Sequence, residues 1–534
     1  MIPFDYNYPY ATFRTPVMAR RGAVATSHPL AAQVGLRILQ EGGNAVDAAV
    51  ATAAALTVLE PTSNGIGGDA FAIVWDGKQL YGLNASGRAP AALTLDVFRR
   101  QGLTEVPADG WLPVTVPGAV SAWVELTRRF GSMPLRDLLE PAARYAEEGH
   151  PVPPVIASYW RRAERRFGHR EDFARTFLPN GRAPKPGELF RCPDQARTLR
   201  LIGESDGEAF YRGELAEKIA AYAEHTGGFL TKDDLAAHRA EWVEPIRTSY
   251  RGYDVWEIPP NGQGIAALLA LNILEGTPVA DLPHLSAARL HLIIEALKLA
   301  FADAHRYVAD PALADVPVAQ LLSKEYAAGR RALISPAQAL KDVQAGRPDL
   351  GGTVYLCTAD AEGRMVSFIQ SNYMGFGSGV VVPGTGIALQ NRGHCFTLEE
   401  GHPNQLAPGK RPFHTIIPAF ITKDGAPLAA FGVMGGDMQP QGHVHTVLGI
   451  VDHRLNPQSV FDAPRVRVAP NGTVHVESTL HPDVIRQLAA LGHDVRVEVD
   501  WSMFGGGQMI WRDPDTGVYI CGTEPRKDGV VAAW

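Results

Sequence analysis

Apolar residues recur at helical spacing through the first part of the chain. Over residues 29–59 a glycine pair at 42–43 ends one run, and Asn44 can cap the next. Residues 27–28 offer a cap for the first run, which has a proline in its first turn. Asp47 lies at the positive end of the second run, where a carboxylate is favourable. The pattern therefore predicts two packed helices.

The following segments predict a hairpin and then further helices. Residues 71–85 contain two apolar runs around an Asp-Gly pair at 76–77, which is typical of a β-hairpin. Helical spacing returns over residues 120–148 and 284–307. An Asp-Pro pair at 310–311 ends the second run, because the residue before proline disfavours the helical conformation.

The pattern changes to strands at Thr353. Residues 342–352 are polar and contain glycine and proline, as is typical of an exposed connector. Residues 353–360 and 365–371 then form strand-like runs around a turn, and further runs continue through residues 517–525. The sequence thus predicts a mixed α/β chain that is mostly helical before the connector and rich in strands after it.

Composition is that of an ordinary soluble globular protein. The 534 residues are 46% hydrophobic and 20% charged, which is enough for a large core in one intertwined domain or in two. The net charge of −7 argues against a nucleic-acid surface, because such a surface is normally basic. The four cysteines have no metal-ligand spacing, so we expect neither a metal nor another cofactor.

Two segments bear on targeting and on membrane contact. Residues 1–22 lack the apolar stretch of a secretory signal, so the sequence predicts a cytoplasmic protein. Residues 45–59 are apolar but contain Asp47 and are too short to span a bilayer, so we expect no membrane contact.

Thr353 is the candidate nucleophile. A threonine hydroxyl is weak, but at a chain terminus its own α-amine, with a pKa near ~8, can act as the base. A cut between Gly352 and Thr353 would create that terminus, and the glycines at 351–352 leave the scissile carbonyl open. For this tripeptide alone, a plain turn-to-strand junction carries most of the weight.

Gly435 and Gly436 form the second candidate group. They follow an apolar strand, and adjacent unhindered N–H groups there could stabilise a developing oxyanion. The alternative for an isolated glycine pair is a tight turn.

Considered together, these motifs resemble the γ-glutamyltransferase (γ-glutamyltranspeptidase) family of N-terminal-nucleophile hydrolases, over nearly the whole chain. The matching sequence segments are GAVATSHPLAAQVGLRILQEGGNAVDAAVA, VPGAVSAW, YRGYDVWEIPP, LNILEG, EALKLAFADAHRYVADP, FGSGVVVPGTGIALQN, PGKRP and DAPRVRV. The resemblance implies an αββα four-layer sandwich with a mostly helical large-subunit portion. It also implies one intertwined fold of two autocleaved pieces, residues 1–352 and 353–534, and leaves a homodimer of these pieces open.

The resemblance assigns roles to the candidate residues. Thr353 falls on the family's autoprocessing and catalytic threonine, and Ser371 falls on a hydroxyl residue that hydrogen-bonds the nucleophile. Gly435 and Gly436 fall on the oxyanion glycines.

The substrate-binding positions depart from the family pattern. Ser86 stands where family members carry an arginine for the glutamyl α-carboxylate, and Arg88 is the predicted substitute. His394 begins the His-Cys-Phe stretch that replaces an Asp-Asp-Phe-like motif, so the substrate's α-amino group loses its usual aspartate. These departures resemble a divergent branch that also contains oxamate amidohydrolases. The predicted substrate-binding residues are Arg88, Asn391, Arg392, His394, His414 and Thr415.

The resemblance thus implies an autoprocessing threonine amide hydrolase or acyltransferase whose substrates are γ-glutamyl amides such as glutathione. The segment between residues 396 and 410 is short beside family members that carry a lid over the site. The resemblance therefore implies an open pocket, which favours water as the acceptor. The first alternative is an amidohydrolase acting on oxamate or another small acyl amide. The second alternative is an uncleaved, inactive family member that serves as a binding protein.

Other catalytic and metal motifs receive little support. His443 and His445 form an H-x-H within a predicted helix, where such residues diverge, so packing is favoured over zinc. The chain has no G-x-S-x-G elbow for a serine hydrolase, and it has no phosphate-binding or dinucleotide-binding glycine motif.

Overall fold

A computed structural model describes residues 14–341 and 351–534. The connector predicted over residues 342–352 therefore lies outside the described residues, apart from its last two glycines, which begin a strand.

Two seven-stranded sheets form the centre of the fold in the described part of the chain. The order of the first sheet is β21 (Val530–Ala533), β2 (Gly22–Thr26), β10 (Gly351–Asp360), β11 (Met365–Met374), β3 (Asp69–Trp75), β4 (Leu80–Ala85) and β7 (Glu241–Val243). The order of the second sheet is β1 (Val17–Ala19), β20 (Tyr519–Thr523), β19 (Gly506–Arg512), β15 (Ala426–Met434), β14 (Ala419–Lys423), β9 (Tyr253–Glu257) and β8 (Ile246–Tyr250). Segments from before and after Thr353 contribute to both sheets, so the two predicted pieces are interleaved.

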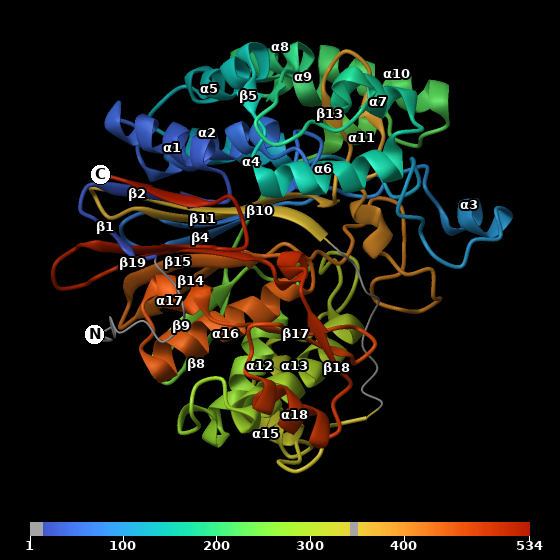
Figure 1. Cartoon of the computed structure of the whole chain (residues 1–534). Helices are drawn as coiled ribbons and strands as arrows, with labels where there is room; N and C mark the ends of the chain where they lie inside the picture. The colour runs from blue at the N-terminus through green and yellow to red at the C-terminus, as the bar shows by residue number, and fades with distance from the viewer. Residues whose placement is uncertain (1–13, 342–350) are drawn as a thin grey trace.

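Helices cover the outer face of each sheet (Figure 1). Those over the first sheet include α1 (Pro29–Gln40), α2 (Ala45–Leu59), α4 (Ala119–Phe130), α5 (Leu135–Glu148) and α8 (Pro193–Glu204). Those over the second sheet include α12 (Gly264–Glu275), α13 (Ala287–Tyr307), α16 (Met438–His453) and α17 (Pro457–Asp462). This arrangement confirms the predicted αββα sandwich.

The layers meet through apolar side chains. Between the sheets the core includes Phe71, Tyr355, Ile369, Phe420 and Ile510, all essentially inaccessible. Helix α2 is buried along its whole length, because its many alanines let it pack between the first sheet and α5. No helix in the described ranges is long and apolar enough to cross a membrane.

The predicted helix ends are largely confirmed. His28 caps α1, with its Nδ1 accepting the N–H of Leu30 at 3.1 Å, and Asn44 forms a reciprocal capping box with Asp47. The single helical run predicted over residues 120–148 is instead two helices, α4 and α5, because the intervening residues 131–134 include a glycine and a proline that break it.

The hairpin of β10 and β11 places the candidate nucleophile. Gly352 pairs with Tyr373 and Val354 pairs with Gln370, so Thr353 faces two residues of β11 where a regular ladder has one. This irregularity is a β-bulge, which locally re-aims side chains. It lies at the end of the strand pair, beside the C-terminal end of β15 across the sandwich, as the packing of the Tyr355 ring against Gly432 indicates.

Candidate active site

The hydroxyls of Thr353 and Ser371 meet at this bulge. Thr353 Oγ1 and Ser371 Oγ lie 3.1 Å apart, and both residues are buried. The Tyr373 N–H donates to Ser371 Oγ at 2.7 Å, which fixes the position of the serine hydroxyl. The structure therefore brings together the two hydroxyl residues that the sequence pairs, while their catalytic roles stay a prediction.

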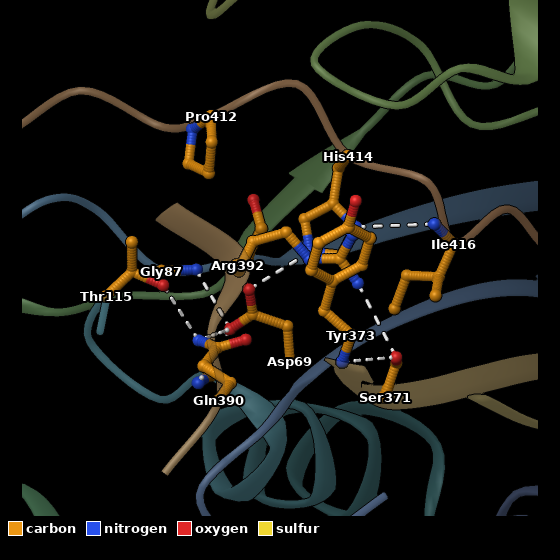
Figure 2. Close-up of polar contacts among 12 residues, drawn as sticks. Asp69, Gly87, Thr115, Ser371, Tyr373, Gln390, Arg392, Pro412, His414 and Ile416 are labelled. Atoms are coloured by element: carbon orange, nitrogen blue, oxygen red, sulfur yellow. Dashed lines mark hydrogen bonds and ion pairs between the residues drawn. The ribbon is translucent and has the colours of Figure 1, made fainter. Parts of the chain in front are cut away.

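A buried arginine lies next to this pair. Arg392 begins the short 3-10 helix η3 (Arg392–Cys395) and is fully inaccessible. Its Nη1 donates to Thr415 Oγ1 at 2.7 Å. Its Nη2 lies 3.5 Å from Ser371 Oγ, and the guanidinium stacks over the Tyr373 ring (Figure 2). Among the described residues no carboxylate forms an ion pair with it. Such a cation beside the candidate nucleophile is suited to bind an anionic group.

His414 is held by a carboxylate that sequence reasoning missed. Asp69 Oδ2 lies 3.0 Å from His414 Nε2, and both side chains are fully buried (Figure 2). Asp69 Oδ1 accepts hydrogen bonds from the N–H groups of Gly87 and Gly118 and from the side-chain amide of Gln390. The signal that could have revealed Asp69 is a carboxylate at the start of an apolar strand, directly after a glycine-rich segment.

Burial sets the charge of this pair. It raises the pKa of Asp69 to about 6, although the amide of Gln390 and the guanidinium of Arg392 oppose the shift. Burial, followed by the charges of Arg392 and Arg411, lowers the pKa of His414 well below its usual value. His414 is therefore neutral at pH 7, and its Nε2–H donates to Asp69. Both ring nitrogens serve internal contacts, so the pair acts as a support, and a role of His414 in substrate binding stays a prediction.

Gly435 and Gly436 form the junction between β15 and α16. Both have positive φ angles, +129° and +63°, which favour glycine. The Gly435 carbonyl oxygen accepts the N–H of Met438 at 3.1 Å. Because a trans peptide directs its N–H opposite to its C=O, the Gly436 N–H is directed away from α16. This geometry is compatible with the predicted oxyanion role.

Gln263, which sequence reasoning also missed, connects the glycines to the arginine. Its side-chain amide donates to the Gly436 carbonyl oxygen at 2.9 Å and to the Thr415 carbonyl oxygen at 2.6 Å. Thr415 in turn accepts from Arg392. A continuous series of contacts therefore runs from Thr353 through Ser371, Arg392, Thr415 and Gln263 to Gly436. No sequence motif marks Gln263, because it lies far from the other members along the chain.

A cavity of about 180 Å³ opens beside these groups. We call it the first cavity, and the residues on its wall include Tyr373, His394, Cys395, Thr415, Gly436 and Asp437. His394 and Thr415 are thus the predicted substrate-binding residues that line it. Asp437 forms an ion pair with Arg467, whose Nη2 donates to both carboxylate oxygens, at 2.8 and 3.0 Å.

Arg88 and Asn391 have other contacts. Arg88 forms ion pairs with Asp310 and Glu241, each at 3.1 Å, and donates to the Gly409 carbonyl oxygen. Asn391 accepts the Met374 N–H and donates to the Ala108 carbonyl oxygen. Neither residue lines the first cavity. Their predicted substrate-binding roles therefore stay predictions without support from these contacts.

One side-chain group in the described ranges has the geometry of a metal site. The ligand atoms of His291, Glu295 and His493 lie within 4.8 Å of one another. The Lys298 ammonium donates to Glu295 at 2.8 Å and lies 3.4 Å from His493 Nδ1, so a cation already contacts two of the three residues. We interpret this group as a hydrogen-bond network. The H-x-H motif lies in α16, as predicted, with His443 bonded to Glu257 at 2.6 Å.

Comparisons with known proteins agree with this geometry. The family described as "Gamma-glutamyltranspeptidase" matches residues 31–534. The glutathione hydrolase-like YwrD proenzyme of Bacillus subtilis is 38% identical over 96% of this chain and 99% of its own length. The oxamate amidohydrolase proenzyme of Klebsiella pneumoniae is 37% identical over 97% and 99%.

A solved structure is more similar still. The cephalosporin acylase from Bacillus halodurans is 55% identical, covers 100% of this chain and 99% of its own, and has a TM-score of 0.94. The family match over almost the whole chain and these relatives lead to one conclusion: the chain belongs to the gamma-glutamyltranspeptidase family.

Proposed function

We propose that this protein is a self-processing threonine amide hydrolase. In the first step Thr353 Oγ1 attacks the Gly352 carbonyl carbon, the peptide bond breaks, and an ester forms while the nitrogen of Thr353 takes up the proton. Water then hydrolyses that ester and leaves Thr353 with a free α-amine. The observation that carries this proposal is the contact of Thr353 Oγ1 with Ser371 Oγ at a β-bulge. Relatives named as proenzymes support it.

The same hydroxyl then acts on substrates. The α-amine of Thr353 takes the hydroxyl proton as Oγ1 attacks the amide carbonyl, and the N–H groups of Gly435 and Gly436 stabilise the oxyanion. The amine leaves with that proton, and water hydrolyses the acyl ester to release the acid. Because the free amine must be unprotonated, activity is expected to fall below a pH of about 8.

We further propose that the acyl group carries a carboxylate. The support is Arg392, a buried guanidinium two contacts away from the nucleophile and without a carboxylate partner among the described residues. A buried charge is costly unless it is paired, so a substrate carboxylate would complete this site.

The acyl group that fits best lacks an α-ammonium. Asp437 is the carboxylate on the described wall of the first cavity, and it is already paired with Arg467. A glutaryl amide, which is a γ-glutamyl amide without its α-ammonium, needs no such partner. The likeness to a protein named cephalosporin acylase also supports an acylase.

Two other substrates are candidates, and one structural observation favours each of them. A γ-glutamyl amide is favoured by the presence of Asp437 on the cavity wall, if its carboxylate is shared with the substrate. Oxamate is favoured by the short path from Arg392 to Thr353, because its carboxylate adjoins the amide carbonyl.

Two experiments test the proposal. Electrophoresis of fresh wild-type protein should show two pieces, whereas the Thr353→Ala variant should remain one chain. An uncut wild-type chain would favour the alternative of an inactive binding protein.

Turnover of glutaryl p-nitroanilide, γ-glutamyl p-nitroanilide and oxamate should then be compared. We expect kcat/KM for the glutaryl substrate to be about tenfold above that for the γ-glutamyl substrate. Added glycylglycine should not accelerate turnover, since water is the expected acceptor. A preference for γ-glutamyl or for oxamate would reassign the acyl group.

A further inference from the structure

A second cavity of about 210 Å³ lies on the other side of the glycine pair. Its wall includes Thr62, Tyr159, Arg162, Arg166, Gly435 and Lys527. The first cavity is lined by Gly436 and Tyr373, whereas the second is lined by Gly435 and Gly375. The ends of strands β15 and β11 therefore lie between the two cavities. The paired glycines therefore stand between two cavities.

This placement has a chemical consequence. During attack on an amide, the carbonyl carbon becomes tetrahedral, and the acyl chain and the amine leave that carbon in different directions. An oxyanion held at Gly435 and Gly436 would direct one group into each cavity. Since Arg392 contacts Thr415 on the wall of the first cavity, the acyl carboxylate belongs there, and the amine belongs in the second.

Three cationic side chains line the second cavity. Arg162 and Arg166 lie one turn apart on α6 (Pro154–Phe167), and Lys527 faces them. No carboxylate is found among the described residues on its wall. The acidic partners of the two arginines, Asp500 and Asp109, lie off the wall and are more than half exposed.

Apolar surface accompanies the charge. Ala163 and Met434 line the cavity, and the Tyr159 ring lies under the Lys527 ammonium, which donates to the Tyr159 hydroxyl at 2.6 Å. A ligand that fits has a carboxylate for the cations and a flat or apolar body for the remaining wall.

We propose that the second cavity is the binding site of the leaving amine, and that it selects amines that carry a carboxylate. This inference rests on the proposed amide hydrolysis. It extends that proposal by naming the chemical class of the amine.

The kinetic test uses two substrates with the same acyl group: glutaryl p-nitroanilide and glutaryl 3-carboxy-4-nitroanilide. The processed wild-type enzyme should show a higher kcat/KM for the carboxylated anilide. Arg166→Gln and Arg162→Gln should each lower that value about fivefold, and leave the neutral anilide within about twofold. Arg165→Gln is the matched control, because Arg165 is exposed on the same helix and is absent from the wall. Equal losses for both anilides, or none for the carboxylated one, would overturn the proposal.

A binding measurement separates this inference from the proposed hydrolysis. Titration calorimetry should show that the amine 5-amino-2-nitrobenzoate binds the wild-type enzyme, that 4-nitroaniline binds more weakly, and that Arg166→Gln abolishes the difference. If the carboxylated amine binds selectively but neither anilide is turned over, the amine-binding role of the second cavity is supported and the proposed hydrolysis is contradicted. If both anilides are turned over but the two amines bind equally well, only the proposed selectivity of the second cavity is contradicted.

Discussion

The side-chain amide of Gln263 donates to the Gly436 carbonyl oxygen at 2.9 Å, although 173 residues separate the two along the chain. Gln263 precedes α12, which packs on the second sheet, and Gly436 precedes α16 on the same sheet. The hydrogen bond joins segments from the two predicted pieces. It fixes the backbone immediately after the glycine pair, on which the proposed oxyanion contacts depend.

Gly436→Ala should reduce turnover without unfolding the protein. The φ angle of +63° is unfavourable for alanine by about 1 kcal/mol, and a shift of the backbone would misplace the N–H donor. Loss of such a donor lowers kcat by about 10²-fold. Steady-state kinetics and a thermal melt measure the two effects separately.

Gly425→Ala is the matched control for backbone strain. Gly425 has a φ angle of +78° in the β14–β15 turn, and an added Cβ there meets no atom within 4 Å. This variant should lose similar stability and retain full activity. Equal activity losses in both variants would argue against an oxyanion role for Gly436.

Ser371→Ala should slow self-cleavage and substrate turnover together. The change removes the hydroxyl that lies 3.1 Å from Thr353 Oγ1, and each hydrogen bond to a reacting group is worth about 1 kcal/mol or more. We expect both rates to fall by about tenfold. Ser371→Thr keeps the hydroxyl and should restore them, as electrophoresis over time and an anilide assay can show. Unchanged rates in the alanine variant would remove Ser371 from the site.

Arg392→Lys should selectively weaken substrates whose acyl group carries a carboxylate. Lysine keeps the charge but cannot reproduce the planar fork that contacts Thr415 and Ser371. For glutaryl p-nitroanilide we expect KM to rise about tenfold, at a cost of about 1.4 kcal/mol. Butyryl p-nitroanilide, a neutral substrate of similar length, is the comparison. If both substrates lose kcat equally, Arg392 positions Ser371 instead of binding substrate.

Acid should destabilise the fold through buried histidines. Burial, followed by the charges of Arg411 and Arg88, lowers the pKa of His238 to about 3. An unfolded chain binds a proton at this histidine below a pH of about 6.5 and the folded chain does not, so stability is lost as the pH falls. For this group the loss at pH 5 is about 2 kcal/mol.

His238→Gln should flatten this pH dependence. Glutamine keeps a polar group near Ser121 Oγ, which lies 2.9 Å from His238 Nε2. The difference in the free energy of unfolding between pH 7 and pH 5 should shrink by about 2 kcal/mol, as denaturant titrations measure. His225→Gln changes an exposed histidine and should leave that difference unaltered. An unaltered difference in His238→Gln would show that His238 is protonated in the folded protein.

The sequence by itself determined the local elements. Asn44 and Asp47 predict a helix start because capping joins residues only three positions apart. The strand from Thr353 and the glycine pair at 435–436 are likewise visible as short patterns. The motif resemblance added the layered fold and strengthened the prediction that Thr353 is the nucleophile.

Only the tertiary structure decided which distant residues meet. Asp69 contacts His414 and Gln263 contacts Gly436 because the sheets and loops bring these segments together, which no local periodicity encodes. The same packing pairs Arg88 with both Asp310 and Glu241, which the local sequence does not indicate. Such long-range contacts form when whole layers bury their apolar faces against one another. The contacts of Asp69 and Gln263 therefore cannot be predicted until those layers are assembled.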